Sequence, residues 1–208
     1  MPRLFVGSFL EGPEAERISA ITKARASQIS SGFLPGQQIE FKIRALPKDK
    51  LHLTWLFLGE VNSSDVEELT RQFAATLNQL KQKLSCPAFE LSYDHLSPWP
   101  SEDKARVVVL RPSAPPAEVS RVEREIRATL SSFQENEEVY PQFNPHLTLF
   151  RVNPAADLRS VELLANSHSL APEEKRSQIS AAIFPVKQTI TINDIRLIKS
   201  ENGYTIIA

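Results

Sequence analysis

A three-residue phrase, His-Leu-Thr, occurs twice in this chain of 208 residues. The first copy runs from His52 to Thr54 and the second from His146 to Thr148, each inside an apolar run (LHLTWL and PHLTLF). The chain has four histidines, and two of them stand in this context, 94 positions apart (146 − 52). A histidine that serves only packing has no reason to recur with Leu-Thr attached. We therefore expect an internal duplication, a shared chemical function, or both.

Two His-x-Thr pairs are suited to acid–base chemistry on a phosphoryl group. Histidine titrates near neutral pH, so one imidazole can take a proton from an attacking water while the other gives a proton to the leaving oxygen. Threonine hydroxyls can donate hydrogen bonds to phosphate oxygens without adding charge. Arg151, just past the second motif, can bind the phosphate through its forked guanidinium, and Arg44 is a second candidate substrate ligand.

Each of these residues also has a structural explanation. A single histidine in a strand is usually a packed residue with a satisfied hydrogen bond, and threonine is common in strands. An isolated arginine is more often a solvated charge than a ligand. Repetition favours function for the two motifs, whereas His95 and His168 lack that context and are expected to be structural or exposed.

A metal site is not expected. Neither motif has a cysteine or an acidic residue at ligand spacing. Cys86 is the single cysteine, which excludes an internal disulfide and a Cys-rich zinc site, and we expect it to be a small buried hydrophobe. We therefore predict chemistry that requires no metal or other cofactor.

Strands are the elements expected to hold the two motifs, because both lie in short β-prone apolar runs. Side chains two residues apart share one face of a strand, so His52 and Thr54 should face away from Leu53 and Trp55, and the second motif should do the same. The other predicted strands are 3–10, 39–46, 89–96 paired with 105–112, 186–200 and 204–208. The predicted helices run from Pro13 to about Ile29, around Val66 to Leu84, from Pro115 past Leu130, and over 155–165.

The order of these elements, β-α-β-β-α-β followed by β-α-β-α-β-β, predicts an α+β protein with antiparallel sheets and outer helices. We expect residues 1–208 to form a single domain with two pseudo-symmetric lobes. The active site should lie in a cleft between the lobes, where the two motif strands meet. The composition, 41% hydrophobic and 24% charged, is typical of a chain with a packed core.

Charge and hydropathy limit the possible partners. The net charge of −1 disfavours binding to a long nucleic-acid duplex, which calls for a basic surface, but is compatible with a local pocket for one phosphate or one strand end. No apolar run is long enough to cross a membrane, and the run over 4–10 is too short for a signal peptide. We expect a cytoplasmic monomer with no membrane partner.

The two motifs together resemble the double His-x-Thr/Ser signature of the 2H phosphoesterase superfamily. LHLTWLFLGE and NPHLTLFRV resemble the first and second motifs of the bacterial and archaeal RNA 2′,3′-cyclic phosphodiesterases, also called 2′-5′ RNA ligases. The opening RLFVGSF and the closing DIRLIKS-ENGYTII are similar to the first strand and last hairpin of that branch. The resemblance spans nearly the whole chain. Ala45 departs from it, because relatives often carry an aromatic residue after an arginine there, and this predicts weaker base stacking.

The resemblance implies a two-lobed fold and hydrolysis of a 2′,3′-cyclic phosphate at an RNA end, with the 2′-phosphate as product. It implies His52 as general acid, His146 as general base, and Thr54 and Thr148 as phosphate ligands. The implied partner is an RNA or oligonucleotide with a 2′,3′-cyclic phosphate end. The alternatives are action on a small cyclic nucleotide or a tRNA-splicing by-product, 2′-5′ RNA ligase activity, and a non-catalytic module that binds RNA ends.

Overall fold

The computed structural model describes residues 1–29, 32–33, 40–84, 88–134, 143–156, 158, 188–201 and 203–208. The elements follow in the order β1 (Arg3–Phe9), α1 (Gly12–Ile29), β2 (Gly32–Phe33), β3 (Glu40–Ala45), η1 (Lys48–Lys50), β4 (His52–Glu60), α2 (Val66–Leu84), β5 (Phe89–Tyr93), β6 (His95–Trp99), η2 (Glu102–Lys104), β7 (Ala105–Arg111), α3 (Ala117–Leu130), η3 (Ser131–Phe133), β8 (Leu147–Ala156), β9 (Gln188–Ile192), β10 (Arg196–Lys199) and β11 (Thr205–Ile206). Cys86, His168 and most of the helix predicted over 155–165 lie outside the described residues.

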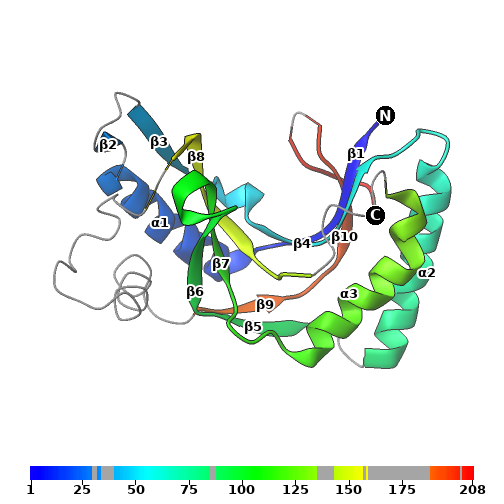
Figure 1. The fold of residues 1–208 in the computed structure, drawn as a ribbon. Coiled ribbons are helices and arrows are strands. Elements are labelled where there is room, and N and C mark those ends of the chain that lie inside the picture. Colours follow the sequence, from blue (N-terminus) through cyan, green and yellow to red (C-terminus); the bar gives the residue numbers. More distant parts are fainter. Residues whose placement is uncertain are drawn as a thin grey trace.

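Nine strands of the described residues form one sheet that divides into two lobes (Figure 1). The first lobe contains β11-β10-β1-β4, and the second contains β6-β7-β8-β3-β2. Leu53 of β4 pairs with Leu147 of β8 and thereby joins the two lobes. A separate two-stranded sheet pairs β5 with β9. All of these pairings are antiparallel, so the α+β class predicted from the sequence is confirmed.

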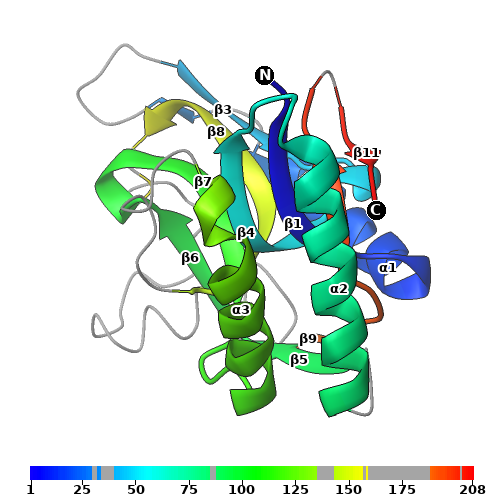
Figure 2. The same cartoon turned by 90° about the vertical axis from the view of Figure 1, so that its right-hand side faces the viewer.

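The helices cover the lobes from outside. Helices α2 and α3 lie side by side against the first lobe (Figure 2), while α1 packs against β3 and β8 of the second. Apolar residues at spacings of three and four place one stripe of α3 in the core, namely Val119, Val122, Ile126 and Leu130, each 0% exposed. Burial of a side chain of this size contributes about 1.5–3 kcal/mol to stability. None of the described helices is long and apolar enough to cross a membrane.

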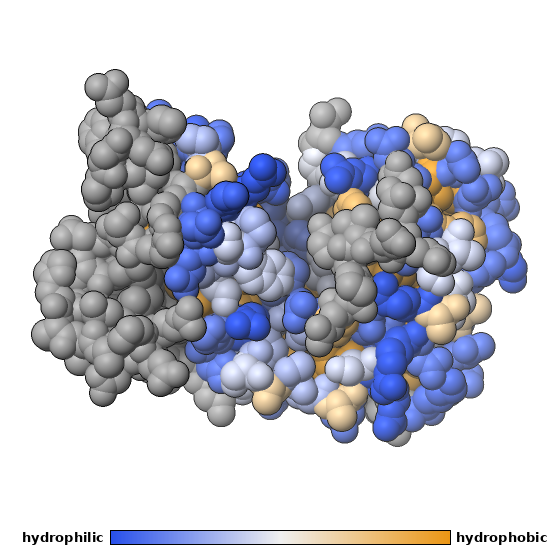
Figure 3. All heavy atoms as spheres, viewed as in Figure 1, coloured by the Kyte–Doolittle hydropathy of each residue, from blue (hydrophilic) through white to orange (hydrophobic). Residues whose placement is uncertain are grey.

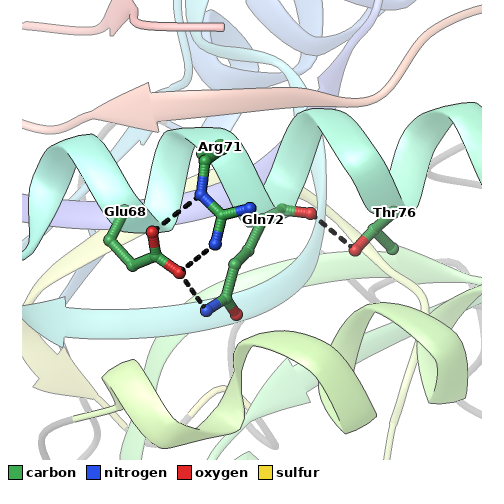
Figure 4. Close-up of polar contacts among 4 residues, drawn as sticks. All are labelled: Glu68, Arg71, Gln72 and Thr76. Atoms are coloured by element: carbon green, nitrogen blue, oxygen red, sulfur yellow. Dashed lines mark hydrogen bonds and ion pairs between the residues drawn. The ribbon is translucent and has the colours of Figure 1, made fainter.

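Polar side chains of α2 satisfy one another along the helix (Figure 4). Glu68 accepts hydrogen bonds from Arg71 Nε at 2.8 Å and from Gln72 Nε2 at 2.7 Å. The hydrogen bonds from Arg71 lower the pKa of the Glu68 carboxyl to about 2. Thr76 Oγ1 donates to the backbone oxygen of Gln72 at 2.8 Å. Partners three or four residues apart are neighbours on a helix, so these contacts support α2 locally.

Two strand predictions and one helix prediction need correction. Residues 89–96 do not form one strand paired with 105–112: β5 pairs with β9, and β6 pairs with β7. The Asp94 carboxylate accepts hydrogen bonds from the backbone and hydroxyl of Ser113 at 2.8 and 2.7 Å, between the two short strands. The predicted strand over 186–200 is likewise two strands, β9 and β10. Residues 155–156, predicted as the start of a helix, end β8. Alternation shows which face of a strand is buried, but not which strand is its neighbour.

The two lobes do not correspond to the two halves of the sequence. The first lobe takes β1, β4 and α2 from the N-terminal half, and α3, β10 and β11 from the C-terminal half. The second lobe likewise combines α1 and β3 with β7 and β8. The repeated phrase therefore marks two equivalent strands at the junction of the lobes.

Candidate active site

The two His-Leu-Thr motifs lie where the lobes join. The bridge between β4 and β8 links the leucines at the centre of the two motifs. In antiparallel pairing, the residues that flank a bridge lie opposite each other on the neighbouring strand. His52 therefore lies across from Thr148, and Thr54 lies across from His146. A pseudo-two-fold axis through the bridge relates the two pairs.

Each motif alternates between the core and one outer surface, as predicted. The apolar members, Leu53, Trp55, Leu147 and Leu149, are at most 1% exposed. The two histidines and two threonines are half-buried on the opposite side of the sheet. We call that side the cleft face, defined by His52, Thr54, His146 and Thr148 and by the side chains that project from the same side of the neighbouring strands.

Both histidine rings are held by the same kind of hydrogen bond. Nδ1 of His52 lies 2.8 Å from the backbone oxygen of Lys50, and Nδ1 of His146 lies 2.8 Å from that of Asn144. A carbonyl oxygen can only accept, so Nδ1 carries the proton in each ring. This leaves Nε2 of both imidazoles to exchange a proton with a substrate. The two motifs therefore match in sequence and also in the tautomer of their histidines.

Aromatic rings fix the orientation of both imidazoles. His52 packs against Phe5, Phe9 and Tyr204, with ring centroids at 5.0, 6.0 and 5.1 Å. The histidine of the second motif packs against Trp99, with centroids 4.4 Å apart. None of the four aromatic residues was among the predicted site residues. A signal existed for two of them, because Phe5 and Phe9 share one face of the first strand, whereas Trp99 falls between the predicted strands 89–96 and 105–112.

Gly7 allows the Phe5 ring to reach His52. It pairs with Thr54 across β1 and β4. A Cβ atom at position 7 would lie 2.8 Å from the Phe5 ring and 3.1 Å from the backbone oxygen of Leu53, closer than side chains pack. Glycine is thus required here by close approach of a ring and a backbone oxygen.

Burial is the main cause of the unusual acidity of both histidines. It lowers the pKa of His52 and of His146 below the ordinary value of 6.5. The positive charges of His146 and Arg151 lower the pKa of His52 further, while the hydrogen bonds to backbone oxygens raise both. An anion bound between the histidines favours the protonated imidazole. It would therefore oppose the lowering of both pKa values by burial and by the nearby positive charges.

We predict that inorganic phosphate raises the pKa of both motif histidines. In phosphate-free buffer their titration midpoints, followed by NMR of the imidazole protons, should lie below 6.5. Added phosphate should move both midpoints to higher pH, because the anion stabilises the charged rings. His95, at the opposite end of β6 from Trp99, serves as the internal reference and should not respond. Titration midpoints of His52 and His146 at or above pH 6.5 in phosphate-free buffer would show that burial does not lower their pKa values.

A β-bulge in the second motif strand brings Arg151 to the cleft face. Strict alternation from His146 would place residue 151 on the core side. The register between β7 and β8 shifts in this region, so that no residue of β7 lies directly opposite Leu149. As a result Leu149 and Phe150, although consecutive, are both buried, and Arg151 returns to the outer side, where it is exposed.

The first motif strand contains the same bulge. The register between β1 and β4 shifts so that no residue of β1 lies directly opposite Trp55, and Trp55 and Leu56 are both buried. Phe57 then returns to the cleft face, opposite Phe5. Phe57 and Arg151 are equivalent, each five residues after its histidine. The first lobe thus presents a ring at the position where the second presents a guanidinium.

Arg44 joins Arg151 on the cleft face of the second lobe. The two arginines are directly paired across β3 and β8, and both are exposed. On its other side Arg151 pairs with Val107, which in turn pairs with Trp99. The surface is hollowed between the lobes, and the described residues that line the hollow from the second lobe are mostly hydrophilic (Figure 3). The structure therefore brings all six predicted site residues to one face.

Ala45 lies on the other side of β3. It pairs with Phe150, which is 1% exposed, and packs against the core. An aromatic residue at position 45 would extend toward the core side, so the prediction of weaker base stacking at the cleft is wrong. Among the described ranges, no group of three or more His, Cys, Asp or Glu side chains is arranged to hold a metal ion.

Solved structures share this fold over nearly the whole chain. One is described as a phosphoesterase, with a TM-score of 0.58 and 23% identity, covering 100% of this chain and 96% of its own. E. coli LigT complexed with 3′-AMP has a TM-score of 0.59 and 20% identity over 100% and 95% of the two chains. TT0787 of Thermus thermophilus has a TM-score of 0.56 and 20% identity over 99% and 95%. At these identities the likeness establishes the fold.

Sequence comparison gives the family. No match was found among curated protein sequences. The family model for the 2′-5′ RNA ligase superfamily matches residues 13–203, a span that contains both His-Leu-Thr motifs and most of both lobes. This confirms the superfamily that the two motifs indicate. The chain therefore belongs to the 2′-5′ RNA ligase superfamily, a group of phosphoesterases and ligases that act on phosphodiesters.

Proposed function

We propose that this protein hydrolyses 2′,3′-cyclic phosphate ends of RNA by metal-independent acid–base catalysis with His52 and His146. One observation carries the proposal: two imidazoles in equivalent settings flank one strand bridge, each with Nδ1 held by a backbone carbonyl and Nε2 available. Binding of an RNA end would not require two titratable groups with matched tautomers. Transfer of one proton to the substrate and one from water does require them.

The proposed reaction is a single displacement at phosphorus. Neutral His146 accepts a proton from water through Nε2, and the water oxygen bonds to phosphorus. The bond from phosphorus to the 3′ oxygen breaks, and protonated His52 donates its proton to that oxygen, which leaves a 2′-phosphate. The threonine hydroxyls and the Arg151 guanidinium hold the non-bridging oxygens. The assignment of acid and base to the two histidines comes from the family resemblance.

The electrostatics of the site suit this sequence of steps. In the free protein burial lowers the pKa of His52, and the positive charges of His146 and Arg151 lower it further. A cyclic phosphate is an anion, so its binding beside these groups shifts the equilibrium of His52 toward the protonated imidazole. That is the form a general acid needs.

The two walls of the cleft differ in a way that favours a nucleotide. The first lobe presents the partly exposed rings of Phe9 and Tyr204 beside His52, with the buried ring of Phe5 beneath them. The second lobe presents the guanidinium groups of Arg44 and Arg151. Stacking surfaces beside positive charges are the features that proteins use to bind bases and phosphates of a single strand.

The proposal is tested with an RNA oligonucleotide that ends in a 2′,3′-cyclic phosphate. We expect hydrolysis in the presence of EDTA, with the 2′-phosphate as product, identified by chromatography against 2′- and 3′-phosphate standards. A parallel reaction with a 5′-hydroxyl RNA measures ligation. Tight binding without turnover would instead show a non-catalytic module. Turnover that EDTA abolishes and zinc or manganese restores would overturn the metal-independent mechanism.

The threonines should matter less than the histidines. Thr54→Val and Thr148→Val each remove one neutral hydrogen bond to phosphate, worth about 0.5–1.5 kcal/mol, so kcat/KM should fall by about 2- to 12-fold. An enzyme with one acid and one base has a bell-shaped pH profile of activity, with one limb from each group. Both limbs should persist in the threonine variants, because threonine does not titrate in this range. Thr189→Val, an exposed position on β9, is the matched control and should retain full activity. Loss of one pH limb in a threonine variant would contradict the roles given to the histidines.

A further inference from the structure

The second lobe carries more positive charge at the cleft than one phosphate requires. Lys42 stands two residues before Arg44 on β3 and pairs with Asn153 of β8. Arg44 pairs with Arg151. The intervening residue of β3, Ile43, is buried, whereas Lys42 and Arg44 are exposed. Because residues two apart share a face, Lys42 and Arg44 both project from the cleft face.

Structural contacts do not account for this cluster. Within the part of the chain that the structure describes, neither Lys42 nor Arg44 forms an ion pair with an acidic residue. Arg44 and Arg151 are like charges directly opposite each other on neighbouring strands, an arrangement that destabilises a sheet. A bound anion removes this repulsion. The chain as a whole has a net charge of −1, so the local excess of positive charge on this wall does not follow from the composition.

The cluster extends away from the histidines. From His146, just before β8, the chain continues along β8 through Thr148, Arg151 and Asn153, and β3 places Arg44 and Lys42 beside the last two. A strand rises about 3.3 Å per residue, so Lys42 lies about 7 Å beyond Arg44 along this line. Neighbouring phosphates of a flexible RNA strand are separated by a comparable distance. A cyclic phosphate at the histidines would therefore leave the next phosphate of the strand within reach of Arg44 and Lys42.

We propose that Lys42 and Arg44 form a second phosphate subsite, which binds the phosphate on the 5′ side of the terminal nucleotide. The substrate is then the end of an RNA strand in preference to a free nucleoside 2′,3′-cyclic phosphate. This inference rests on the proposed hydrolysis of cyclic phosphate ends. It specifies in addition which part of the substrate, beyond the reacting cyclic phosphate, the protein binds.

A pair of minimal substrates tests the subsite. Adenosine 2′,3′-cyclic phosphate is compared with the same nucleotide carrying a 5′-phosphate, and the measured quantity is the ratio of the two kcat/KM values. We expect wild-type protein to prefer the 5′-phosphorylated nucleotide by about 10- to 100-fold, because charge-assisted contacts are involved. In Lys42→Ala/Arg44→Ala protein this ratio should fall toward one. No preference in wild-type protein, or a preference that survives the double substitution, would overturn the proposal.

A matched control removes the same charge elsewhere. Lys81→Ala/Arg121→Ala changes two exposed residues on α2 and α3 of the first lobe and should keep the 5′-phosphate preference. If this control also lost the preference for the 5′-phosphorylated nucleotide, the preference would come from general electrostatic attraction between the protein and the phosphate, and there would be no subsite.

A binding measurement separates this inference from the proposed reaction. If wild-type protein hydrolyses neither nucleotide, the proposed function fails, and the subsite is then judged by calorimetry. Adenosine 2′,5′-bisphosphate should bind more tightly than adenosine 2′-phosphate to wild-type protein by about tenfold or more. The Lys42→Ala/Arg44→Ala protein should bind the two equally. Equal affinities in wild-type protein would overturn the subsite whether or not turnover is observed.

Discussion

Replacement of His52 or His146 by alanine is expected to lower kcat by about 10²- to 10⁴-fold, the usual effect of losing a positioned proton-transfer group. Both imidazoles are half-buried, and each makes one hydrogen bond to a backbone oxygen. The loss should therefore leave the fold intact, which circular dichroism and thermal unfolding can verify. His95→Ala is the matched control and should retain most of the activity. Full activity in either motif variant would exclude the two-histidine mechanism.

A change of leaving group assigns the two roles. A substrate whose 3′ oxygen is replaced by sulfur has a leaving group that needs no proton. If His52 is the general acid, the sulfur substrate should restore much of the activity of His52→Ala protein and little of that of His146→Ala protein. If the sulfur substrate instead restored the activity of His146→Ala protein, His146 would be the general acid and His52 the general base. The two-histidine mechanism itself would stand. In each single variant one limb of the pH profile should also disappear.

Replacement of Arg151 by alanine is expected to lower kcat/KM by about 10- to 150-fold. A hydrogen bond from a charged donor is worth about 1.5–3 kcal/mol, and the bulge after Thr148 directs this guanidinium to the cleft face. The substitution also removes a positive charge that lowers the pKa of His52. The NMR titration midpoint of His52 in the free protein should therefore move to higher pH.

Arg151→Lys separates the charge from the geometry of the guanidinium. Lysine keeps the positive charge, so the His52 midpoint should stay near its wild-type value, but it cannot make the forked contact, so kcat/KM should recover only in part. Arg121→Ala, on the exposed side of α3, is the control and should alter neither quantity. Unchanged kcat/KM in Arg151→Ala protein would remove this residue from the phosphate site.

The sequence by itself determined which side of each motif strand the two histidines and two threonines occupy. The phrase His-Leu-Thr repeats, and alternation places both histidines and both threonines opposite apolar neighbours that are at most 1% exposed. The long helices followed from apolar spacings of three and four. These features are local, because the period of a helix or a strand is set by its own backbone.

The position of Arg151 was decided by the tertiary structure. Strict alternation from His146 places it on the core side, and the bulge at Leu149 reverses that. A trace of the bulge exists in the sequence, since two consecutive bulky apolar residues follow each Thr, Trp55-Leu56 and Leu149-Phe150. Such a pair becomes a bulge only when the neighbouring strand skips a residue, and the register of that strand depends on distant contacts.

Strand neighbours were likewise decided only by the tertiary structure. The pairing of Arg44 with Arg151, and the packing of Phe5 and Tyr204 on His52, join segments that are far apart in the sequence. The backbone of any strand offers the same donors and acceptors to every other strand, so hydrogen bonding alone selects no partner. The choice is made by how the buried faces of all strands and helices fill one core, and that is a property of the whole chain.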